Sequence, residues 1–120
     1  MKGESDYGII MSALAMGDLR DVQARIRGRL RKLNIAQKYR ASDRISAYII
    51  MLENLQAVLE GKMSVDDFIR SLENPLVSRE FRFVDNWQDF VGSITYYLNY
   101  YIDRYDIHLP EFDAKRSDDR

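Results

Sequence analysis

Residues 19–33 read LRDVQARIRGRLRKL, and the spacing of the apolar residues in this stretch decides the expected fold. The apolar side chains recur at steps of three, four, four and three residues, at Leu19, Val22, Ile26, Leu30 and Leu33. An α-helix has about 3.6 residues per turn, so this spacing places them in one continuous stripe. Asp18 favours a helix start here, because its carboxylate can accept the unpaired N–H groups of a first turn.

Helical signals continue on both sides of this stretch. We expect further helices at residues 6–16, between Ser42 and Gly61, between Ser64 and Asn74, and at residues 86–106. Gly17 suits the left-handed position that follows a helix, and Pro75 is interpreted as a stop. Residues 77–84 alternate poorly and are predicted to be irregular or a short extended segment. Since no pair of good strands exists, the prediction is an all-α bundle of four to five helices.

The length and composition are typical of one folded domain. The chain has 120 residues, of which 46% are apolar and 31% charged. We expect a single helical domain over residues 1–112 and a solvated tail over residues 113–120. The absence of Cys excludes disulfides and thiolate metal sites and suits a reducing compartment. The apolar run at residues 7–16 is too short to cross a bilayer, so we expect a cytoplasmic protein.

The near-neutral net charge of −1 conceals a strong polarity along the chain. Residues 20–44 hold nine basic and two acidic side chains, a net charge of +7. Residues 45–120 hold eight basic and fourteen acidic side chains, a net charge of −6. The total therefore excludes a wholly cationic nucleic-acid binder but leaves two surfaces of opposite sign.

The basic segment offers a candidate nucleic-acid surface, namely Arg25, Arg27, Arg29, Arg31 and Lys32. On a helical wheel, however, these residues flank the apolar stripe on both of its edges. Arginine stems at the margins of a core helix can cover apolar surface and pair with acidic neighbours. We therefore interpret the segment as solvated or internally paired flanks, with nucleic-acid binding as the alternative.

The last expected helix has an aromatic core side and a second, polar side. Its core residues fall in one broad sector: Trp87, Phe90, Val91, Ile94, Tyr97, Leu98, Tyr101, Ile102 and Tyr105. Two tyrosines and three carboxylates gather on the opposite side, at Asp85, Asp89, Tyr96, Tyr100 and Asp103. Tyrosine is large, rigid and tipped with a hydroxyl, which makes it a frequent interface anchor. This acidic and aromatic surface is the best candidate for binding a basic protein partner.

No arrangement of residues in the sequence points to catalysis. His108 is the only imidazole and lies at a helix end, where it is expected to interact with the helix dipole. Asp66 and Asp67 belong to a helix first turn, which favours acids for the same reason. The sequence supplies no nucleophile, base or ligand set, so we expect neither an enzyme nor a bound metal or cofactor.

One stretch resembles a known family. Residues 52–68, LENLQAVLEGKMSVDDF, resemble the helix, Gly-Lys-hydrophobic-Ser turn and acidic-acidic-Phe helix start of small bacterial colicin-type immunity proteins. The resemblance implies a helical protein that binds a cognate toxin domain tightly and blocks its active site or substrate surface. Toxin inhibitors of this class tend to present acids and tyrosines to cationic nucleases.

Three functions follow as hypotheses. The first is an immunity protein that occludes a bacterial nuclease toxin through the acidic and aromatic surface. The second is a nucleic-acid-associated subunit that uses the basic segment at residues 20–44. The third is a homo-oligomeric structural protein, because Ile50, Met51 and Val58 lie off the main stripe of their helix and face either a second subunit or a second core layer.

Overall fold

The computed structural model describes residues 12, 14, 15, 17–81 and 87–109. Within these residues the chain forms one all-α globule without strands, as predicted from the sequence. Its five helices are α2 (Leu19–Tyr39), α3 (Asp43–Leu59), α4 (Val65–Ser71), α5 (Pro75–Phe81) and α6 (Trp87–Tyr105). Most of the helix expected at residues 6–16 and the whole tail at residues 113–120 lie outside the described residues.

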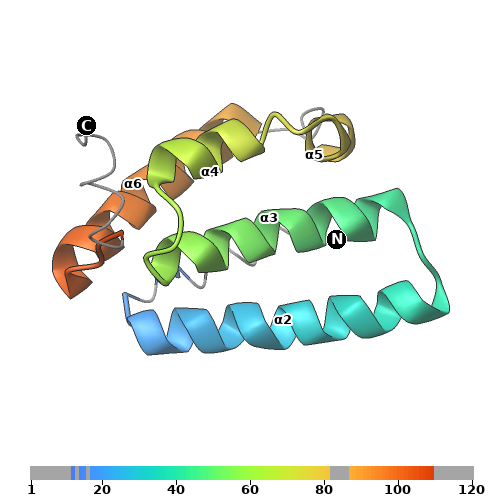
Figure 1. The fold of residues 1–120 in the computed structure, drawn as a ribbon, viewed down its shortest axis with the longest axis horizontal. Helices are drawn as coiled ribbons and strands as arrows, with labels where there is room; N and C mark the ends of the chain where they lie inside the picture. Colours follow the sequence, from blue (N-terminus) through green and yellow to red (C-terminus); the bar gives the residue numbers. More distant parts are fainter. Residues whose placement is uncertain (1–11, 13, 16, 82–86, 110–120) are drawn as a thin grey trace, which may run out of the picture.

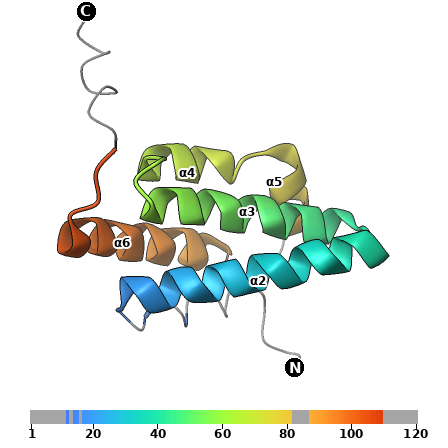
Figure 2. The same cartoon turned by 60° about the horizontal axis from the view of Figure 1, so that its bottom comes forward.

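Helix α3 lies at the centre of the bundle. It packs against α2, α4, α5 and α6, and the two views show it between α2 on one side and α4 on the other (Figures 1 and 2). Its buried side chains are Ala47, Tyr48, Met51, Leu52, Leu55, Val58 and Leu59. Of the three residues off the main apolar stripe, Met51 and Val58 are fully buried in the core, and Ile50 packs against it partly buried. Met51 and Val58 therefore offer no surface to a second subunit.

The helix starts follow the capping residues predicted from the sequence. The Asp18 carboxylate accepts hydrogen bonds from the N–H groups of Arg20 and Asp21, at 3.0 and 3.4 Å. The hydroxyls of Ser42 and Ser64 accept in the same way, from Ile45 N–H at 3.1 Å and Asp67 N–H at 3.0 Å. Each cap satisfies backbone donors that the first turn leaves unpaired, so each fixes where its helix begins.

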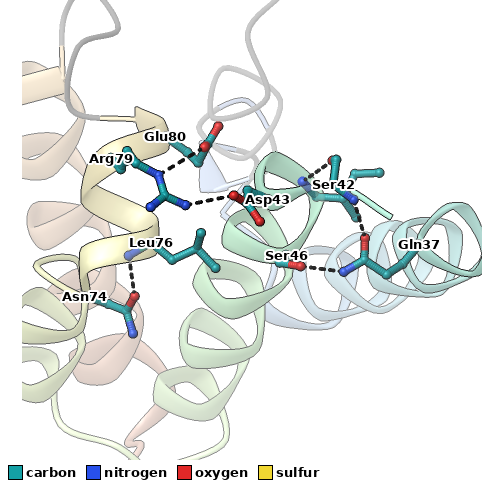
Figure 3. Close-up of polar contacts among 9 residues, drawn as sticks. Gln37, Ser42, Asp43, Ser46, Asn74, Leu76, Arg79 and Glu80 are labelled. Carbon is teal, nitrogen blue, oxygen red and sulfur yellow. Dashed lines mark hydrogen bonds and ion pairs between the residues drawn. The ribbon is translucent and has the colours of Figure 1, made fainter. Parts of the chain in front are cut away.

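Helix α5 corrects the sequence prediction for residues 77–81, while residues 82–84 of the same predicted segment lie outside the described residues. Instead of an irregular or extended segment, Pro75–Phe81 is helical (Figure 3). The Asn74 side-chain oxygen accepts from Leu76 N–H at 2.8 Å, so Asn74 caps the helix that Pro75 begins. Pro75 thus starts a helix. Proline is well suited to this first position, because the N–H group that it lacks would have no partner within the helix. Val77 and Phe81, four residues apart, bury the inner side of this turn.

Side-chain contacts fix how the hairpin of α2 and α3 meets α5 (Figure 3). The Gln37 side chain donates to the Ser46 hydroxyl and accepts from Ser42 N–H, so it joins the end of α2 to the start of α3. Across the next interface, the Arg79 guanidinium lies 2.9 Å from the Asp43 carboxylate. These exposed contacts orient the elements more than they stabilise them.

Two tyrosines of α6 hold the turn that precedes α2. The Tyr101 hydroxyl donates to the Leu14 carbonyl oxygen at 2.6 Å and accepts from Gly17 N–H at 3.0 Å. The Tyr105 hydroxyl donates to the Gly17 carbonyl oxygen at 2.9 Å. Tyr101 is 0% exposed, and this burial raises the pKa of its phenol above the ordinary value. The C-terminal helix is therefore fastened to residues more than eighty positions earlier in the chain.

Replacing the Tyr101 hydroxyl tests this attachment. We expect Tyr101→Phe to lower the free energy of unfolding by about 1–3 kcal/mol, because it leaves the Leu14 carbonyl and Gly17 N–H without their partner. Since the folded-state pKa of Tyr101 is raised, the unfolded chain releases this proton first and stability falls as the pH rises above the unfolded value of 10.0. Denaturant unfolding at neutral and alkaline pH measures both effects. The role given to the Tyr101 hydroxyl would be contradicted if Tyr101→Phe were as stable as the unaltered chain at neutral pH. It would also be contradicted if the variant lost as much stability at alkaline pH as the unaltered chain does.

Two glycines with similar backbone angles are expected to respond differently to alanine. Gly17 and Gly61 have φ values of 78° and 77°, which cost an L-residue about 1–2 kcal/mol. A Cβ at Gly17 meets no neighbouring atom, whereas a Cβ at Gly61 stands 2.6 Å from the His108 carbonyl oxygen. Gly61→Ala should therefore cost about 1–3 kcal/mol more than Gly17→Ala in thermal or denaturant unfolding. Equal losses would show that the contact with His108 is not maintained.

Candidate protein interface

Helix α6 has one side in the core and one side in solvent. Its buried residues are Phe90, Ile94, Leu98 and Tyr101, and the remaining residues of the predicted core sector pack partly buried against the same core. Near the start of the helix, the Trp87 ring stacks between the rings of Phe81 and Phe90, with centroids 6.2 and 5.3 Å away. The inner side is thus occupied by packing, which confirms the predicted core stripe.

Four residues of the predicted acidic and aromatic surface come together on the outer side. Asp89, Tyr96, Tyr100 and Asp103 are all exposed, and at about 100° per residue they fall within a sector of about 60°. We call these four residues the tyrosine face. Tyr96 is 68% and Tyr100 42% exposed, although both are large and partly apolar. The fifth predicted residue, Asp85, lies outside the described residues.

The exposed rings of the tyrosine face are supported by their neighbours. The Tyr96 ring meets the Tyr97 ring edge to face, with centroids 5.5 Å apart. The Tyr100 ring meets the buried Tyr101 ring in the same way at 5.6 Å. Such contacts limit the orientations of an exposed ring, so less conformational entropy remains to be lost when a partner binds.

A hollow of about 610 Å³ lies beside Tyr96 on the same helix. It is lined by Gln88, Asp89, Gly92, Ser93, Tyr96 and Tyr97. A Cβ at Gly92 would meet no atom within 4 Å, so the floor of the hollow is open backbone surface. Gly92 and Ser93 were not predicted as site residues. They lie four and three residues before Tyr96, a spacing that places small residues beside the ring and could have identified them.

The carboxylates of the tyrosine face are available to a partner. Within the part of the chain that the structure describes, neither Asp89 nor Asp103 has a cationic side chain at ion-pair distance. Elsewhere on the surface, acids do pair with cations, as Asp67 does with Arg70 at 2.6 Å. The face therefore combines supported aromatic surface with free negative charge.

The structure places four of the five residues of the candidate basic surface in solvent. Arg25, Arg27, Arg31 and Lys32 are exposed on α2, whereas the tyrosine face belongs to α6. The fifth residue of that set, Arg29, is half-buried and places its guanidinium over the Tyr48 ring, 5.6 Å from the centroid.

Other candidate features give no second site. His108 lies with Nε2 2.6 Å from an oxygen of the Asp106 carboxylate, just after α6. Among residues 12, 14, 15, 17–81 and 87–109, no three His, Cys, Asp or Glu side chains come together as metal ligands. In the same residues, no helix has the length and apolar character that crossing a membrane requires.

Comparison with known proteins adds no relative. No protein-family model matches the chain, and no curated protein or solved structure is significantly similar to it. The chain's own surfaces are therefore the guide to its function.

The tyrosine face should be dispensable for folding. We expect Tyr96→Ala to change the free energy of unfolding by no more than about 0.5 kcal/mol, because its ring is largely in solvent. Leu98→Ala, two residues further on the buried side, should cost about 2–5 kcal/mol. Denaturant unfolding of both variants provides the comparison. A comparable loss for Tyr96→Ala would mean that its ring serves the fold rather than a partner.

Proposed function

We propose that this chain is a small non-catalytic inhibitor that binds and occludes a bacterial nuclease toxin, in the manner of an immunity protein. The observation that carries the proposal is the tyrosine face, which presents two supported aromatic rings between two carboxylates on a rigid helix. The likeness of residues 52–68 to colicin-type immunity proteins agrees with this function. A cytoplasmic location belongs to the same proposal.

The proposed mechanism is steric occlusion aided by complementary charge. A nuclease must gather Lys and Arg side chains to bind phosphates. Asp89 and Asp103 offer those cations an alternative partner, while Tyr96 and Tyr100 fill apolar hollows between them. Long-range attraction between the two surfaces accelerates association, and the buried rings slow dissociation. The inhibitor needs no chemistry of its own.

The proposal requires a gene adjacent to this one to encode a cationic nuclease domain, and that domain is the probe. The full chain should bind it one to one and abolish its cleavage of DNA or RNA. Tyr96→Ala with Tyr100→Ala should weaken binding by about a hundredfold or more, because central aromatic anchors each contribute about 2 kcal/mol or more. Calorimetry measures the affinity, and a nuclease assay measures inhibition.

Tyr39→Ala is the matched control. Tyr39 is 86% exposed, more so than either tyrosine of the face, but it lies at the end of α2. The proposal requires Tyr39→Ala to bind and inhibit as the unaltered chain does. If the Tyr96 and Tyr100 variant remains fully inhibitory while folded, or if the nuclease is not inhibited at all, the proposal is wrong.

A further inference from the structure

Helix α2 lies at the edge of the bundle with most of its circumference exposed. It packs chiefly against α3, and both views place it along one border of the molecule (Figures 1 and 2). Only Val22, Ile26 and Leu33 are buried among its 21 residues. The buried side is therefore narrow, and a straight surface about 30 Å long faces solvent.

Two basic edges border this exposed surface. At about 100° per residue, Arg20, Arg27, Arg31 and Lys38 fall in one sector about 40° wide. Arg25 and Lys32 fall in a second sector on the other side, about 130° away. All six side chains are exposed. Because the buried stripe of α2 is narrow, the cations that flank it also border the exposed surface of the helix. Both rows of cations can therefore contact one partner that covers this surface.

The charges of the two basic edges are not neutralised within the described part of the chain. No carboxylate lies at ion-pair distance from any of the six, whereas Lys62, Arg70 and Arg79 on other elements each have one. Of the two states expected from the sequence, solvated or internally paired, these six side chains are therefore in the solvated one. The one acidic side chain on the surface between the edges is Asp21, in the first turn of α2.

Between the two basic edges, the surface of α2 has small side chains in its N-terminal half and apolar side chains in its C-terminal half. Ala24 and Gly28 occupy the middle of its N-terminal half, and the nearest atom to a Cβ at Gly28 is a terminal nitrogen of Arg31 at 4.0 Å. A flat or ridged partner can consequently approach the helix backbone there. Further along, Ile35 is 51% exposed beside Tyr39, so apolar contact is available in the C-terminal half.

We infer that α2 binds double-stranded DNA by lying in its major groove, with the two basic edges on the phosphates of the two groove walls. The groove is about 12 Å wide, and a helix with its side chains measures about 10–12 Å. Four of the six cations are arginines, whose planar guanidinium binds phosphate in a bidentate way. Duplex RNA fits less well, because its major groove is deep and narrow. This function uses residues other than the tyrosine face and goes beyond the proposed inhibition.

Fluorescence anisotropy with a labelled mixed-sequence DNA duplex and the full chain tests the inference. We expect micromolar affinity at about 50 mM salt, falling by several hundredfold at about 200 mM, as contact with about five phosphates requires. Arg27→Gln with Arg31→Gln should weaken binding by about tenfold or more and reduce the salt slope by about 2. Duplex DNA should bind more tightly than a single strand or duplex RNA of the same length.

Arg70→Gln with Arg79→Gln is the matched control, because it removes the same charge from α4 and α5, where both arginines are ion-paired. It should bind DNA within about twofold of the unaltered chain, and so should the Tyr96 and Tyr100 variant that tests inhibition. The inference is overturned if DNA binding is absent or insensitive to salt, or if the control pair loses as much as the α2 pair. It is also overturned if the α2 pair instead abolishes binding to phosphatidylserine vesicles or self-association, measured by light scattering.

Discussion

The burial of α3 is the constraint on which the remaining structure depends. Every other helix of the described chain packs against it, and its side chains are buried on more than one side. Each such side chain contributes about 1.5–3 kcal/mol by leaving water, so the helices that cover α3 must turn their apolar sides inward. For α2 and α6 this leaves one long face of each in solvent, and these are the two surfaces with a functional interpretation.

The relative position of those two surfaces is set by the hydroxyls of Tyr101 and Tyr105. Both reach from α6 to the turn at Leu14 and Gly17, immediately before α2 begins. Buried hydrogen bonds of this kind have strict geometry, and losing one partner leaves a polar group unsatisfied. The helix that carries the tyrosine face is therefore joined directly to the turn from which the helix with the basic edges begins.

Much of the fold could be predicted, because its signals are local. Asp18, Ser42 and Ser64 cap helices by hydrogen bonds to residues two or three positions away, and apolar spacing identified the buried sides of α2 and α6. Residues 77–81 were predicted wrongly because Pro75, which follows the end of α4, also begins α5, and the burial of Phe81 depends on packing that the sequence does not show.

The candidate sites were only partly predictable. Helical spacing alone placed Tyr96 and Tyr100 on an exposed side, and the structure does the same. The sequence did not predict that Arg29 is half-buried while Arg31 is exposed. This difference depends on where Tyr48 of α3 lies across the helix interface. The role of Tyr101 was also hidden, since its partners are more than eighty residues away in sequence.

Recognition of a protein partner by the outer side of α6 can be followed ring by ring with ¹⁹F NMR of the chain labelled with 3-fluorotyrosine. The eight tyrosines provide internal references, including exposed Tyr39 and buried Tyr48. On addition of the nuclease domain that the proposal requires, we expect the Tyr96 and Tyr100 signals to shift while those of Tyr39 and Tyr48 do not. Shifts at Tyr39 with unchanged Tyr96 and Tyr100 signals would contradict this expectation.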